Sequence, residues 1–294
     1  MKKDAAKNNL IRSMILVTHS LKRFYSRSEK IALSLMHEFG GVWIFFGEVI
    51  KTTKKTTGHR DPIIAQIAEV SLRAMSTVMF AGVFVGAIMV LQFDTMLRRF
   101  DAEALLGGLN TSATIREVGP LIISFLLAGK IGAYTTAELA NMRVTEQIDA
   151  IESLGTNSIQ YLIIPRFFAI ILSSIVLLAI GLSVSIVGAV FIADSFSGMN
   201  LYQYISSIPR FVGIWTLFEG LVRCTIFSTI VATVSTFKGY TATGGARGVG
   251  RAVTASAIYI NVYIVIANFI SSSLLEWLHD LLLFLSSIVE RIMP

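Results

Sequence analysis

The sequence predicts an all-α membrane protein, and three observations lead to this fold class. Hydrophobic residues make up 54% of the 294 residues and charged residues only 15%, whereas about a quarter of a soluble domain is charged. The mean hydropathy is +0.69. Three runs long enough to cross a bilayer as helices contain no charged side chain: 74–93, 167–193 and 252–275. The net charge of +6 is explained by basic residues beside membrane spans, so no nucleic-acid partner is expected.

Two segments precede the first predicted span. Residues 1–30 form a basic extension, which we expect on the cytoplasmic side. Residues 31–60 are apolar, but glycine and glutamate interrupt them and basic residues flank them. This pattern favours an amphipathic helix in the membrane interface, followed by a linker, although the apolar stretch is just long enough to cross.

Five spans are predicted within residues 61–275. Asp61 and Pro62 are typical of the N-cap and the first position of a helix, which continues into span one and ends near residue 93. Residues 94–113 are mixed in charge and rich in glycine, so we expect an external loop with a short helix. The other spans are expected within 114–138, 161–192, 211–237 and 252–275, and residues 276–294 are expected to form an amphipathic tail.

The distribution of lysine and arginine indicates the orientation, because these residues accumulate in cytoplasmic segments. Residues 1–60 contain twelve, the loop 193–209 after span three contains none, and the loop after span four contains three. This distribution predicts a cytoplasmic N-terminus and, after five spans, a C-terminus on the opposite side. Arg98 and Arg99 are exceptions on the predicted outer side.

Charged residues are concentrated between spans two and three, where residues 137–155 read AELANMRVTEQIDAIESLG. Four apolar residues there are spaced by four, three and three, as on one face of a helix: Val144, Ile148, Ile151 and Leu154. Other faces carry Arg143, Glu146, Asp149 and Glu152. A short amphipathic helix over about 143–154 is therefore predicted on the cytoplasmic side. It is either a solvated connector or a coupling helix that docks in a groove of a soluble partner.

Ionisable residues inside the predicted spans are a second functional feature. A charge at mid-bilayer costs about 2.5–3.5 kcal/mol on insertion scales, so such residues usually face a partner or a wet cavity. Span two contains Arg116, Glu117 and Lys130, and span four contains Glu219 and Arg223 in a favourable i,i+4 spacing. Two interpretations remain open. The charges pair internally and hold the spans together, or they line a cavity that contacts a lipid headgroup.

No catalytic, cofactor-binding or metal site is predicted. The glycine-rich segment 238–251 lacks the Walker pattern of a phosphate-binding loop. The four histidines are scattered along the chain, and the single cysteine, Cys224, lies in an apolar run. Any ATP hydrolysis therefore has to come from another chain.

Two segments of the sequence match a known signature: they are REVGPLIISFLLAGKIGAYTTAELANMRVTEQIDAIESLG, residues 116–155, and FKGYTATGGARGVGRAVT, residues 237–254. They resemble the signature of MlaE/YrbE-type permeases, which are the membrane subunits of ABC transporters that work with MCE-domain proteins. The resemblance extends over about residues 28–275. It implies an interfacial helix followed by a five-span permease domain.

The resemblance also implies a set of partners. Two copies of the chain form a homodimer around a lipid cavity in a bacterial inner membrane. A cytoplasmic ABC ATPase dimer binds ATP and Mg, and an MCE hexamer lies on the periplasmic face. Phospholipid is the commonest substrate expected for the family. The chain itself is then non-catalytic and binds no cofactor.

The resemblance further implies roles for individual residues. It favours the coupling interpretation of the charged helix, whose candidate ATPase contacts are Arg143, Val144, Glu146, Ile148, Asp149, Ile151 and Glu152. Glu117 and Arg223 match positions near the dimer cavity of related permeases. The full set of lipid-cavity candidates is Phe84, Ile88, Met89, Leu91, Arg116, Glu117, Glu219 and Arg223.

A stand-alone ion-coupled carrier or channel is the alternative, with Glu117, Glu219 and Arg223 as an ion or proton path. The sequence has no evident inverted repeat and no broken pair of helices of the kind such carriers use, which counts against it. A scaffold that anchors other proteins is a weaker option.

Overall fold

The computed structural model describes the backbone of residues 38–54 and 60–292, and side chains over 38–54 and 63–285. The predicted basic extension 1–30 lies outside the described residues. Two compact units are distinguished, Met1–Ile50 and Lys51–Pro294. Within the segment predicted as an interfacial helix, residues 38–53 are helical, and Trp43 and Ile44 are exposed.

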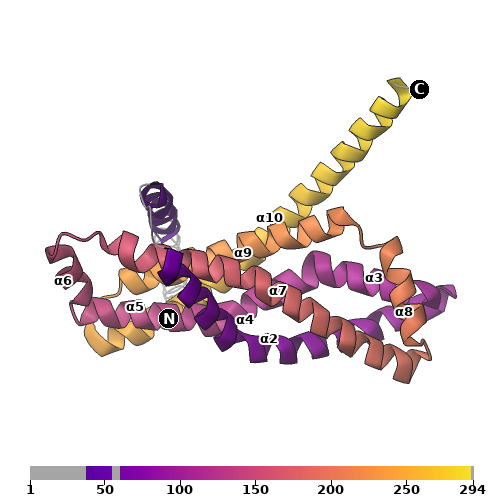
Figure 1. Cartoon of the computed structure of the whole chain (residues 1–294), viewed down its shortest axis with the longest axis horizontal. Coiled ribbons are helices and arrows are strands. Elements are labelled where there is room, and N and C mark those ends of the chain that lie inside the picture. Colours follow the sequence, from indigo (N-terminus) through magenta and orange to yellow (C-terminus); the bar gives the residue numbers. More distant parts are fainter. Residues whose placement is uncertain (1–37, 55–59, 293–294) are drawn as a thin grey trace, which may run out of the picture. The chain divides into compact units, whose positions relative to one another are not determined.

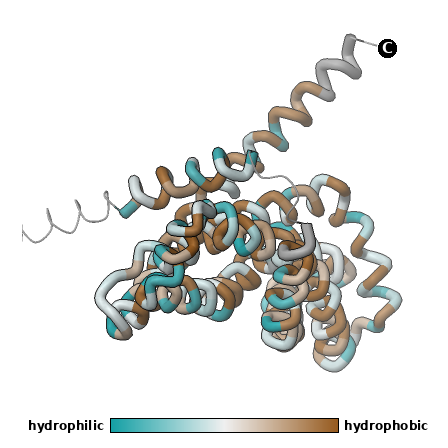
Figure 2. Tube along the Cα trace, turned by 60° about the vertical axis from the view of Figure 1, so that its left-hand side comes forward, coloured by the Kyte–Doolittle hydropathy of each residue, from teal (hydrophilic) through white to brown (hydrophobic). Residues whose placement is uncertain are grey.

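Five helical segments of the second unit are long and apolar enough to cross a membrane (Figure 1), as predicted. They are Ile63–Phe100, Glu103–Val144, Ile159–Ser197, Ile214–Tyr240 and Gly245–Leu285. Figure 2 shows that hydrophobic residues predominate along these helices, with single hydrophilic residues between them. No strand occurs in the part of the chain that the structure describes. The all-α fold class with five spans is therefore confirmed.

The elements of the second unit follow one another with few breaks. Span one is α2 (Arg60–Leu97) with the 3₁₀ turn η1 (Arg98–Phe100). Span two consists of η2 (Glu103–Leu105), α3 (Leu106–Ala113), η3 (Thr114–Val118), α4 (Gly119–Leu127), η4 (Ala128–Gly132) and α5 (Ala133–Val144). The short helix α6 (Gln147–Ser153) precedes span three, which is η5 (Ile159–Ile163), α7 (Ile164–Ile192) and η6 (Ala193–Ser197). Then follow α8 (Leu201–Ser207), η7 (Ile208–Arg210), α9 (Ile214–Tyr240) and α10 (Gly245–Ile292).

Close packing between α2 and α7 depends on glycine. Gly82 and Gly86 have the small-xxx-small spacing that lets two backbones approach. A Cβ atom at Gly86 would lie 1.9 Å from the carbonyl oxygen of Ser185, and one at Gly188 would lie 2.3 Å from that of Val83. Any larger residue at Gly86 or Gly188 would therefore force the two helices apart.

The segment 94–113 contains the predicted short helix as α3, but α3 continues directly into span two instead of lying in an external loop. α3 is largely buried, and a Cβ atom at Gly107 would lie 2.2 Å from the carbonyl oxygen of Tyr204 in α8. The Asn110 amide donates a hydrogen bond of 2.6 Å to the Tyr204 hydroxyl. The small and polar residues that suggest a loop in the sequence instead allow α3 to pack closely against α8.

α10 is one uninterrupted helix of 48 residues, so the tail continues span five. Its length corresponds to about 72 Å, which is more than twice the roughly 30 Å hydrocarbon core of a bilayer. The His279 ring stacks on the Trp215 ring of α9 at 5.2 Å. Beyond residue 275, where the sequence predicted the end of span five, the helix exposes large apolar side chains, including Trp277 and Phe284.

Candidate functional site

Span two carries its two basic intramembrane residues in π-helical turns. Arg116 lies in η3 and Lys130 lies in η4. A π turn holds an extra residue within an α-helix, and such turns are frequent at functional sites. α4 lies between the two turns, so the two cations are separated along the span.

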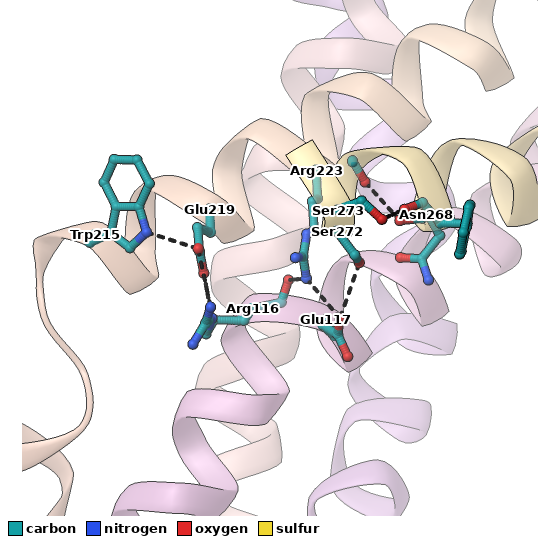
Figure 3. Close-up of polar contacts among 10 residues, drawn as sticks. Arg116, Glu117, Trp215, Glu219, Arg223, Asn268, Ser272 and Ser273 are labelled. Atoms are coloured by element: carbon teal, nitrogen blue, oxygen red, sulfur yellow. Dashed lines mark hydrogen bonds and ion pairs between the residues drawn. The ribbon is translucent and has the colours of Figure 1, made fainter. Parts of the chain in front are cut away.

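Arg116 forms the first of two ion pairs between span two and span four. Its Nη2 atom lies 3.2 Å from Oε1 of Glu219, and its Nε atom contacts Oε2 of the same carboxylate. The Trp215 indole N–H also donates to Glu219 Oε1, at 2.8 Å (Figure 3). Glu219 is fully buried, so this carboxylate depends on its protein partners.

Arg223 forms the second ion pair. Its Nη1 atom lies 3.3 Å from Glu117 Oε1 and donates to the carbonyl oxygen of Arg116 at 2.7 Å. Ser272 of α10 donates to Glu117 Oε1 at 3.1 Å, which brings a third span to the cluster (Figure 3). The Arg223 side chain is 1% exposed, whereas the Glu117 side chain is 52% exposed.

Glu219 and Arg223 do not pair with each other, contrary to the i,i+4 pairing that their spacing suggested. Each reaches across to the oppositely charged residue of η3 instead. The arginine and glutamate of η3 are adjacent in sequence, so one turn of span two supplies partners for both charges of span four.

The ion-paired cluster of Arg116, Glu117, Glu219 and Arg223 shows the internal pairing that the sequence left open, whereas its contact with a lipid headgroup stays a prediction. The pairs balance the charges and connect spans, as internal pairing requires. One side of the cluster is nevertheless accessible, because Arg116 and Glu117 are partly exposed. Arg223 Nε and Asn268 Oδ1 are buried without a hydrogen-bond partner. Asn268 lies beside Ser272 and Glu117 in Figure 3.

The apolar lipid-cavity candidates divide into two groups. Phe84, Ile88 and Leu91 are exposed on one side of α2, whereas Met89 is half-buried. Phe80 extends the exposed group: it is 70% exposed, and its ring centroid lies 4.9 Å from that of Phe84. Phe80 was not among the predicted lipid contacts, although its i,i+4 spacing from Phe84 is visible in the sequence.

The predicted helix over 143–154 is divided by a turn. α5 ends at Val144, so Arg143 and Val144 belong to span two, and α6 begins at Gln147. Glu146 has a φ of 62°, in the left-handed region, which breaks the helix. The Thr145 hydroxyl donates to the Asn141 carbonyl oxygen at 2.8 Å and stabilises the end of α5.

The apolar face predicted for this segment is present only in part. Ile148 is fully buried, Val144 and Ile151 are half-buried, and Leu154 is 84% exposed. Arg143 Nη1 lies 2.5 Å from Asp149 Oδ1 across the turn. Glu146 is exposed, and no hydrogen bond or ion pair of its side chain is found among the described residues.

Glu152 connects α6 to the end of α9. Its Oε1 atom accepts hydrogen bonds from the Ser158 hydroxyl at 2.5 Å and the Tyr240 hydroxyl at 3.0 Å. The Arg143 guanidinium lies 5.8 Å from the centre of the Tyr240 ring. The hydrogen bond from Ser158, then that from Tyr240, lowers the pKa of the Glu152 carboxyl. No short-range signal could have found this contact, since Tyr240 is 88 residues away along the chain.

The described fold and its paired intramembrane charges define a multi-pass helical membrane protein. The family model "Permease MlaE" matches residues 63–274, and the chain belongs to this family of permeases. A probable ABC transporter permease protein of Rickettsia typhi is 32% identical over 236 residues, covering 80% of this chain and 91% of the relative. A probable ABC transporter permease protein of Synechocystis is 31% identical over 220 residues, covering 75% of this chain and 82% of the relative. The chloroplastic protein TRIGALACTOSYLDIACYLGLYCEROL 1 of Arabidopsis thaliana is 30% identical over 230 residues, covering 78% and 66%.

Proposed function

We propose that the chain is the permease subunit of an ABC-type lipid transporter. It moves lipid, most simply phospholipid, between a bacterial inner membrane and a periplasmic MCE protein. The observation that carries the proposal is membership of the MlaE permease family over residues 63–274. The name of the Arabidopsis relative refers to a glycolipid, which supports a lipid substrate.

A separate cytoplasmic ATPase dimer drives transport and holds the ATP and Mg, so this chain is non-catalytic and binds no cofactor. Two copies of the chain form the permease around a shared lipid cavity. The N-terminus lies in the cytoplasm and the C-terminus in the periplasm, where an MCE hexamer binds. The excess of lysine and arginine in residues 1–60 supports this orientation.

The turn between α5 and α6, together with α6, is the proposed ATPase contact. The exposed acidic side chains of Glu146 in the turn and Asp149 in α6 are available to a partner on the cytoplasmic side. Through Glu152 the turn is connected to Tyr240, the last residue of α9. α9 carries Glu219 and Arg223 near its other end, so a single helix joins the proposed ATPase contact to the ion-paired cluster.

The ion-paired cluster is the proposed polar part of the lipid cavity. Arg116 and Glu117 are its accessible members, while Glu219 and Arg223 hold them in place. The exposed apolar side chains Phe84, Ile88 and Leu91 of α2 are the proposed acyl-chain contacts.

Affinity purification of the chain from its native membrane in mild detergent tests this function. We expect an ABC ATPase and an MCE-domain protein to co-purify, and the reconstituted complex to transfer lipid only when ATP is hydrolysed. A chain that transports an ion without ATP and never co-purifies with an ATPase would contradict the proposal. It would favour the ion-coupled carrier instead.

A further inference from the structure

A second polar patch lies between α2 and span two, away from the ion-paired cluster. The Lys130 ammonium donates to the Thr77 hydroxyl at 2.9 Å. One helical turn along, the Arg73 guanidinium stacks on the Tyr134 ring at 4.2 Å and donates to its hydroxyl at 3.4 Å. We call Arg73, Thr77, Lys130 and Tyr134 the inner patch.

The inner patch carries an unbalanced positive charge. Arg73 pairs with Glu69 at 2.8 Å, so its charge is compensated. Among the residues that the structure describes, no carboxylate lies within ion-pair distance of Lys130, although its side chain is exposed. With two cations and one carboxylate, the patch and Glu69 together have a net charge of +1.

The position of Lys130 makes this charge costly in contact with lipid tails. Lys130 lies inside the predicted span 114–138, eight residues or about 12 Å of helix rise from its α6 end. A lysine in the hydrocarbon core costs up to about 2.5–3.5 kcal/mol unless it meets water or an anion. An anion held beside Lys130 would remove this cost.

The apolar side chains beyond the inner patch indicate what kind of anion fits. Arg73, Phe80, Phe84 and Ile88 lie on one side of α2, at spacings of seven, four and four, so the cationic end passes directly into an exposed apolar stripe. Phe80, Phe84 and Ile88 are each more than half exposed. A positive end followed by an apolar stripe matches a negatively charged headgroup followed by an acyl chain.

We propose that the inner patch binds the phosphate of an anionic glycerophospholipid, whose acyl chains lie along Phe80, Phe84 and Ile88. Lys130 supplies the uncompensated charge, and Arg73 and Tyr134 supply further donors one helical turn away. The headgroup then lies toward the α6 end of the span and the chains point toward the ion-paired cluster. This inference rests on the proposed lipid-transport function and adds one headgroup position and a preference for an anionic headgroup.

Native mass spectrometry of the purified full chain can test the site without the ATPase. The chain is incorporated into nanodiscs that contain phosphatidylglycerol and phosphatidylcholine, and the lipids retained on release are counted. We expect phosphatidylglycerol to be retained preferentially. Lys130→Gln and Arg73→Gln should each weaken this retention roughly tenfold, the effect of losing one charge-assisted hydrogen bond. Lys130→Arg should restore it.

Arg99→Gln is the matched control, because it removes an exposed arginine outside the patch. Equal retention of phosphatidylglycerol by Lys130→Gln and Arg99→Gln would overturn the proposal. Equal loss of phosphatidylglycerol from Lys130→Arg and Lys130→Gln would overturn it too. Loss of the dimer mass in Lys130→Gln would also overturn it, since Lys130 would then contact a second copy. If the lipid is retained as expected but ATP-driven transfer fails, the proposed function falls and the binding site stands.

Discussion

Two groups of charged residues in this protein differ in burial and in how far along the chain their ion-pair partners lie. The ion-paired cluster lies inside the spans, and its two carboxylates and two guanidinium groups are paired across helices. The turn between α5 and α6 lies between two spans, and the Arg143–Asp149 pair that bridges it is local and partly exposed. Glu219 is fully buried, whereas the Asp149 side chain is 53% exposed.

The difference shows which charges can be removed without unfolding the spans. A buried charge that loses its partner keeps its desolvation cost, so each member of a buried pair depends on the other. An exposed charge returns to water at little cost, so its presence at a surface needs another explanation. Docking of a partner is such an explanation for Glu146 and Asp149.

Removal of one buried charge should have the largest effect. Glu219→Ala leaves the Arg116 guanidinium and the Trp215 indole without their shared acceptor. We expect the free energy of unfolding to fall by about 3–5 kcal/mol, as for other broken buried ion pairs. Unfolding by denaturant in detergent micelles, followed by circular dichroism, measures this change.

Asp149→Ala provides the exposed counterpart within the same chain. It also breaks one ion pair, but we expect a loss below about 1 kcal/mol because both side chains are partly solvated. Equal destabilisation by the two variants would show that burial does not separate the two groups of charges.

Much of the fold could be predicted because spans leave a strong local signal. The runs 74–93, 167–193 and 252–275 give three spans by length and hydropathy alone. A short helix was expected within 94–113, but its burial was not, because Gly107 and Gly108 read as loop residues. Their role is close contact with α8 and Phe211, which no local pattern reveals.

The sequence also indicated the charges of the ion-paired cluster, but not their pairing. Glu219 and Arg223 are spaced for a pair along one helix, yet each meets a partner more than 100 residues away. Periodicity describes one helix at a time, so it cannot choose between a partner on the same helix and one on a neighbouring span. The connection of Glu152 to Tyr240 was invisible for the same reason.

Charge reversal at the exposed turn should separate assembly from folding. In Glu146→Lys with Asp149→Lys, we expect ATPase co-purification to fall at least tenfold, a loss of about 1.4 kcal/mol. The melting temperature of the spans should change little, because both side chains are exposed. Quantitative pull-down and thermal unfolding of the same preparation give both values.

Asp194→Lys with Glu276→Lys is the matched control, since it makes the same change of charge at exposed positions away from the turn. Normal ATPase binding and transport in the turn variant would contradict the coupling role. A comparable loss in the control would point to a general effect of charge.

The hydrogen bond between α6 and α9 should contribute a smaller amount. Tyr240→Phe removes the hydroxyl that donates to Glu152 and retains the ring beside Arg143. We expect a loss of about 0.5–1.5 kcal/mol in unfolding free energy, typical of one hydrogen bond. Tyr202→Phe, at an 81% exposed tyrosine of α8, should have almost no effect. Identical curves for the two variants would exclude a stabilising role for the Tyr240 hydroxyl.

The smallest effect should be the pH dependence of the Glu152 contact. Hydrogen bonds from Ser158 and Tyr240 lower the pKa of Glu152 below its ordinary value of 4.5, so the folded state binds this proton less readily than the unfolded state. The stabilisation is therefore complete above pH 4.5 and is lost as the pH falls through the folded-state pKa. The difference in melting temperature between the wild type and Glu152→Gln should be constant near neutral pH and should shrink in acid.

Ser158→Ala is the control, because it removes the hydrogen bond that lowers the pKa of Glu152 the most. The difference in melting temperature between Ser158→Ala and the double variant Ser158→Ala, Glu152→Gln should therefore depend less on pH. A wild-type difference that grows in acid would show that the contact favours the protonated carboxyl, and would contradict the assigned hydrogen-bond directions.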